Sequence, residues 1–143
     1  MKKQESGRSM VEMLGVLAII GVLSIGGIAG YMLSMNRFRA NSLIDKASKF
    51  ATIAYSAKQT EKALGKTDGL SPSTFAFSDQ KLGSIDSTES ITLTSFGSTD
   101  GKVQVTVKFA SADVCDTARS ILGITTACAE TGKDTLTLTF QQN

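Results

Sequence analysis

The feature that most constrains this chain is an apolar run, Met13 to Met35, in which no side chain is charged. It reads MLGVLAIIGVLSIGGIAGYMLSM. At about 1.5 Å per residue, a helix of this length spans the roughly 30 Å hydrocarbon core of a bilayer. A helix that is apolar all round needs apolar surroundings on every side. A chain of 143 residues has room for one modest domain besides such a helix. The run therefore predicts a transmembrane helix.

A second helical pattern follows the apolar run without a proline or a cluster of turn residues. Across 36–64 apolar residues recur at alternating steps of three and four, interrupted by Glu61. This stripe consists of Leu43, Ala47, Phe50, Ala54, Ala57 and Leu64. The spacing is typical of one apolar helix face, and Gly65 is a suitable C-terminal cap. The sequence therefore predicts that the rod continues as an amphipathic helix to Leu64.

The composition changes at Gly65, after which Ser, Thr, Gly and Asp dominate as far as Gly101. Three runs with one apolar face at period two predict antiparallel strands: 91–94, 103–109 and 136–140. Between the last two, Ser111 can cap a short helix that stops at Gly123. The predicted fold class is α+β: a long N-terminal helix, half transmembrane and half amphipathic, packed on a small antiparallel sheet with one short inserted helix.

Composition argues against catalysis and against nucleic-acid binding. The formal net charge is +2 and the chain has no His, the commonest general base and metal ligand. Phosphate loops, nucleophile elbows and metal-ligand spacings are absent from the sequence. Four basic residues follow the apolar run: Arg37, Arg39, Lys46 and Lys49. Their side chains could be solvated, contact another subunit, or bind phosphate groups. No aromatic platform is interleaved with them, so we predict no specific nucleic acid, no cofactor and no metal.

Cys115 and Cys128 are the two cysteines of the chain, the first in the predicted short helix and the second just before the last strand. In an exported domain they should form a disulfide. Buried free thiols are the alternative. A metal site is less well supported, because two thiolates without His supply too few ligands.

The residues before the apolar run leave three interpretations. A secretory signal peptide has a basic start and small residues before the cut, as Lys2, Lys3 and Gly27-Ile28-Ala29 provide. Its apolar stretch is shorter than this one, however, and Glu12 is out of place in it. A plain single-pass anchor is the second interpretation. Neither explains why a carboxylate, which is costly in a membrane, stands at the start of the run.

The third interpretation is a resemblance. KKQESG followed by RSMVEMLGVLAIIGVLSIGGIAGY resembles the N-terminal signal of type IV pilins and type II secretion pseudopilins. In that family a short basic leader ends in Gly, a prepilin peptidase cuts after it and methylates the new amine, and the fifth mature residue is Glu. Carried over, the leader is 1–7, cleavage falls between Gly7 and Arg8, and Glu12 is the assembly residue.

The resemblance also implies domains and partners. Residues 8–35 would be the transmembrane and assembly helix, 36–64 its amphipathic continuation and 65–143 a pilin-like headpiece. Many pilins carry a proline in the apolar run; without one here, helix flexibility would centre on Gly26 and Gly27. The implied partners are identical or related pilin subunits, the prepilin peptidase, an inner-membrane assembly platform and, before assembly, the bilayer. Glu12 would pair with the N-terminal amine of a neighbouring subunit.

The function implied is a structural subunit of a type IV pilus or related extracellular filament. The prepilin would lie in the bacterial inner membrane with its N-terminus in the cytoplasm. Two alternatives stay open: a pseudopilin or minor pilin of a type II secretion or DNA-uptake system, and a monomeric membrane-anchored periplasmic binding domain. None of the three is an enzyme.

Overall fold

The computed structural model describes the backbone of residues 5–66, 69–96, 101–129 and 132–141, and the side chains of these residues from Ser9 onward. The chain divides into two compact units, Met1–Met35 and Asn36–Asn143. The first consists of the N-terminal part of helix α1 (Glu5–Ala63). The second holds the rest of that helix and every other element, and it is described by itself below.

Helix α1 ends where the sequence predicts, next to Gly65. The Gly65 N–H donates to the carbonyl of Lys62, and its φ of +70° is a left-handed conformation that glycine adopts without strain. Leu64 was expected to complete the buried stripe, and this is wrong. It lies in the turn beyond the last helical residue and is 70% exposed. The periodicity of a helix cannot place a residue that is no longer helical.

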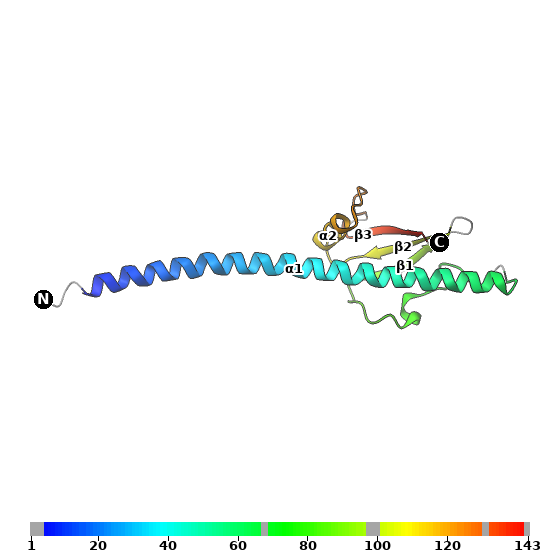
Figure 1. The fold of residues 1–143 in the computed structure, drawn as a ribbon, viewed down its shortest axis with the longest axis horizontal. Helices are drawn as coiled ribbons and strands as arrows, with labels where there is room; N and C mark the ends of the chain where they lie inside the picture. The colour runs from blue at the N-terminus through cyan, green and yellow to red at the C-terminus, as the bar shows by residue number, and fades with distance from the viewer. Residues whose placement is uncertain (1–4, 67–68, 97–100, 130–131, 142–143) are drawn as a thin grey trace. The chain divides into compact units, whose positions relative to one another are not determined.

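A three-stranded antiparallel sheet forms the other side of the second unit, with strand order β1-β2-β3 (Figure 1). The strands are β1 (Ser90–Ser95), β2 (Lys102–Lys108) and β3 (Thr135–Gln141). Ile91 lies opposite Val107, which in turn lies opposite Leu136. This register brings the apolar residues of all three strands to one face, and that face is buried. The predicted α+β layout of a long helix packed on a small sheet is confirmed.

Helix α2 (Ala112–Leu122) is inserted between β2 and β3 and is capped at both ends as predicted. The Ser111 side chain accepts a hydrogen bond from the Val114 N–H, and Gly123 closes the helix in the left-handed region, with its N–H bonded to the carbonyl of Arg119. Cys115 of α2 is bonded to Cys128, which confirms the predicted disulfide. Because it closes a loop of about 13 residues, the bond is worth about 3 kcal/mol in the chain-entropy model.

The core of the second unit joins α1 to the sheet and to the connecting segment between α1 and β1, described from residue 69 to residue 89. From α1 it takes four residues of the predicted stripe, Leu43, Ala47, Phe50 and Ala54, together with Ala40 and Ala51. Phe50 is fully buried, and its ring centroid lies 5.4 Å from that of Phe75 and 5.5 Å from that of Phe77. Phe77 opens a short 3-10 helix, η1 (Phe77–Gln80). Apart from η1, the described residues of the connecting segment form no helix or strand. Aromatic contacts with α1 fix the position of the segment.

Candidate functional site

The apolar part of α1 is unburied in its own unit. Its large apolar side chains, from Met10 to Leu33, are 53–73% exposed. Within the part of the chain that the structure describes, α1 is the one helix long and apolar enough to cross a membrane, judged by length and composition. None of its most apolar window is buried. This surface calls for apolar surroundings from outside the chain, either lipid or other helices.

The backbone polar groups of this segment, and the hydroxyl of Ser24, are satisfied by the helix itself. The backbone is helical throughout, and the Ser24 hydroxyl donates to the carbonyl of Ile20 at 2.7 Å. A hydrocarbon environment admits a helix because its backbone donors and acceptors are paired within the segment. The segment is therefore compatible with a bilayer core along its length.

Glycines give this segment places where another helix can approach closely. A Cβ added at Gly15, Gly21, Gly26, Gly27 or Gly30 would meet nothing within 4 Å. Gly26 and Gly30 stand four residues apart, the small-residue spacing that lets membrane helices pack tightly. The helix runs unbroken through Gly26 and Gly27, and their flexibility stays a prediction.

The predicted processing and assembly residues lie near the start of α1. Glu12 is exposed and lies one helical turn beyond Arg8. Gly7 and Arg8 belong to the same helix, but their side chains lie outside the described residues, as do leader residues 1–4 altogether. Cleavage, methylation and the pairing of Glu12 with another subunit therefore stay predictions.

Two of the four basic residues that follow the apolar run have defined partners. Lys46 donates to the carbonyl of Ser84 at 2.7 Å and so ties the connecting segment to α1. Lys49 forms an exposed ion pair with Asp45, one turn back on the helix. Arg37 and Arg39 are exposed. Sequence reasoning missed the role of Lys46, because its acceptor is a backbone carbonyl far along the chain.

Glu61 anchors the other end of the connecting segment. Its residue surface is 7% exposed, and its carboxylate accepts hydrogen bonds from the Lys58 ammonium at 2.8 Å and from the Leu70 N–H at 2.7 Å. The Lys58 hydrogen bond is the main cause that lowers the pKa of Glu61; burial opposes it, and the backbone amides of Leu70 and Gly69 add to it. A Cβ at Gly69 would lie 2.5 Å from Glu61 Oε1. The one feature of the sequence that indicated this role of Glu61 was the position of a carboxylate inside an apolar stripe.

The Glu61 contacts predict a pH dependence of stability. Because its pKa in the folded chain lies below the ordinary value of 4.5, this carboxylate stabilises the fold above that pH, and the contribution is lost as the pH falls through the lowered value. We expect the denaturation midpoint of the wild type to fall more steeply below pH 4.5 than that of Glu61→Gln, which cannot ionise. Equal slopes for the two proteins in pH-dependent denaturant unfolding would contradict this role.

Among the residues from Ser9 onward that the structure describes, no group of three or more His, Cys, Asp or Glu side chains could hold a metal ion. What stands out is an unburied apolar helix in one unit and a disulfide-bonded α+β fold in the other. Comparison of the chain with protein families, curated proteins and solved structures found no match.

Proposed function

We propose that this chain is a prepilin, and that its mature form, starting at Arg8, is a structural subunit of a type IV pilus or related extracellular filament. One observation carries the proposal: a helix segment with apolar side chains 53–73% exposed belongs to the same chain as a folded unit with a disulfide. Such a surface has to be covered, and the disulfide fits an exported unit. The leader and Glu12 motif at the start of the helix favours a filament over a plain anchor.

Assembly would use the same apolar surface twice. In the inner membrane lipid covers it, and in the filament neighbouring helices replace the lipid. The driving force for the transfer has to come from packing and from charge pairing, because both environments are apolar. Glu12 supplies the pairing: its carboxylate meets the N-terminal amine of a subunit already in the filament, which fixes the register of the incoming subunit. The second unit then forms the filament exterior as a pilin-like headpiece.

The first test is the N-terminal sequence and intact mass of the protein isolated from its native membrane or filament fraction. We expect a chain that starts at Arg8 and is heavier than its sequence by one methyl group. A start at Met1 in all of the material would overturn the proposal in favour of a plain membrane anchor, and a start at Gly30 would overturn it in favour of a secreted domain. Electron microscopy of the same fraction separates an abundant filament subunit from a scarce pseudopilin or minor pilin.

A further inference from the structure

Strand β1 is an edge strand whose outer side lies beside residues 72–85 of the connecting segment. It pairs with β2 on its other side. Among the residues that the structure describes, no backbone hydrogen bond joins β1 to this segment. An edge strand directs a row of N–H and C=O groups away from its sheet. This row is therefore available to a further strand.

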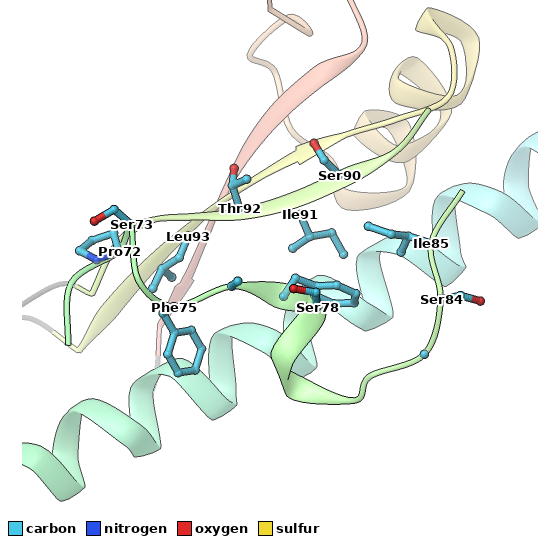
Figure 2. A pocket seen from close by; sticks show the side chains of 13 residues that line it. Pro72, Ser73, Phe75, Ser78, Ser84, Ile85, Ser90, Ile91, Thr92 and Leu93 are labelled. Carbon is cyan, nitrogen blue, oxygen red and sulfur yellow. The ribbon is translucent and has the colours of Figure 1, made fainter. Parts of the chain in front are cut away.

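A groove of about 670 Å³ runs between β1 and the segment (Figure 2). Ile91 and Leu93 point from β1 toward the segment that carries Phe75, whereas Thr92 points to the other side of the strand. The remaining lining is mostly small or hydroxyl-bearing: Pro72, Ser73, Ala76, Phe77, Ser78, Gly83, Ser84, Ile85 and Ser90. None of these lining residues is charged. The groove therefore suits an extended, uncharged segment that adds to the strand edge.

The two edge strands carry few of the devices that normally prevent such pairing. Protein sheets protect their edges with charged residues, prolines or bulges. Here β1 reads SITLTS and β3 reads TLTLTFQ, without a charge or a proline, and the two lysines of the sheet are on the central strand, which reads KVQVTVK. The irregularity in β1 falls between Leu93 and Ser95, past the residues that line the groove. Among the described residues, β1 has no partner on its outer side and β3 has one only at its start, so most of each edge can accept a strand.

We propose that β3 of a second copy of this chain adds to β1 in the groove. β3 has the required chemistry, since it is extended and uncharged and is seven residues long against six for β1. In the described part of the chain, its outer edge carries one isolated bridge, from Ala129 to Thr135 at its start. The rest of that edge can pair with another chain.

Threonine hydroxyls on the outer face of the sheet match this pairing. Thr94 and Thr106 lie 2.7 Å apart between their hydroxyl oxygens, and Thr106 and Thr137 lie 3.2 Å apart. These two hydrogen bonds cross all three strands from one edge to the other. A second copy in the groove would place its own β3 threonines beside those of β1, where their hydroxyls can extend this row of cross-strand contacts.

The topology fixes the direction of the contact. β1 and β3 are both antiparallel to β2, so they run parallel to each other. If the buried faces of two copies stay on one side, β3 of one copy pairs with β1 of the next as parallel strands. Such a contact is heterologous, and it repeats from copy to copy without closing. Pairing of β1 with β1, or of β3 with β3, would instead stop at a dimer.

The test uses the full chain in detergent micelles, where the apolar helix is covered by detergent. Backbone hydrogen exchange is compared at low and high protein concentration. We expect residues 90–93 and 136–140 to exchange about tenfold or more slowly at high concentration. Sedimentation should show association that continues beyond a dimer. Exchange of β1 that does not change with concentration, or association that ends at a dimer, would overturn the proposal.

A matched pair of variants tests the groove itself. Ser78 and Thr88 are both exposed, but only Ser78 lines the groove. Ser78→Lys places an ammonium where the added strand would lie and should abolish the concentration-dependent protection of β1, whereas Thr88→Lys should keep it. Added to the wild type in small amounts, Ser78→Lys should also shorten the assemblies, because it retains β3 and lacks a usable groove. Association of Ser78→Lys equal to that of the wild type would refute the contact.

The proposed contact joins the second unit of one copy to the second unit of another. It does not depend on the apolar helix or on processing at Gly7. Its failure in micelles would leave the proposed prepilin function untouched. A chain that starts at Met1 in native material would, in turn, leave the strand contact standing.

Discussion

Replacing Glu12 with Ala will stop incorporation of the protein into filaments while leaving its insertion into the membrane intact. Insertion should if anything become easier, because a carboxylate at the membrane centre costs about 2.5 to 3.5 kcal/mol on insertion scales and less near an interface. Assembly should fail because the amine of the neighbouring subunit loses its partner. Two unit charges 4 Å apart attract by about 4 kcal/mol at an effective dielectric of 20, which is large enough to decide incorporation.

The controls separate charge from shape. Glu12→Gln keeps the size of the side chain without its charge and should fail as Glu12→Ala does. Phe38→Ala removes an exposed apolar side chain of the same helix outside the apolar run and should assemble. The measurement is the amount of each variant in sheared filaments against the amount in the inner-membrane fraction. Filaments that contain Glu12→Ala at the wild-type level would refute the role assigned to this carboxylate.

The second large effect is expected at Phe50, and it concerns stability. Phe50→Ala should lower the free energy of unfolding of the second unit by about 3 to 5 kcal/mol, the usual cost of truncating a buried aromatic side chain. The side chain is fully buried, and its ring contacts those of Phe75 and Phe77. The substitution would therefore leave a cavity and also release the connecting segment from α1. Denaturant unfolding followed by near-ultraviolet circular dichroism measures the loss.

Phe38 supplies the matched control on the same helix. It is 70% exposed, so Phe38→Ala should change the free energy of unfolding by no more than about 0.5 kcal/mol. In hydrogen exchange, the connecting segment should lose its protection in Phe50→Ala and keep it in Phe38→Ala. Similar unfolding midpoints for the two variants would show that the aromatic cluster does not hold the segment.

Local patterns in the sequence predicted the regular elements correctly. The stripe from Leu43 to Ala54, the alternation in the three strands and the caps at Ser111 and Gly123 all correspond to what the structure contains. Each of these signals arises from neighbours within a few residues, where helix or strand geometry relates sequence spacing directly to a face. The disulfide was also predictable, because the chain has two cysteines and a segment typical of exported proteins.

The connecting segment could not be predicted in the same way. Its residues follow neither the helical nor the strand period, so nothing in the sequence indicated that Phe75 and Phe77 pack on Phe50, or that Lys46 binds the carbonyl of Ser84. The groove beside β1 follows from that placement, since it exists only where the segment passes the sheet edge. These contacts join residues far apart in the chain.

By itself, the sequence determined that this protein has a charge-free apolar helix with Glu12 at its start, followed by an amphipathic helix and a small α+β unit, because hydrophobic period and length are local properties. The tertiary structure alone decided that Glu61 is buried with the Leu70 N–H as a partner and that Leu64 is exposed. It also decided that, among the described residues, β1 has no backbone hydrogen-bond partner on its outer side. The physical reason is that burial and edge pairing depend on which distant segments meet, and no periodicity encodes that.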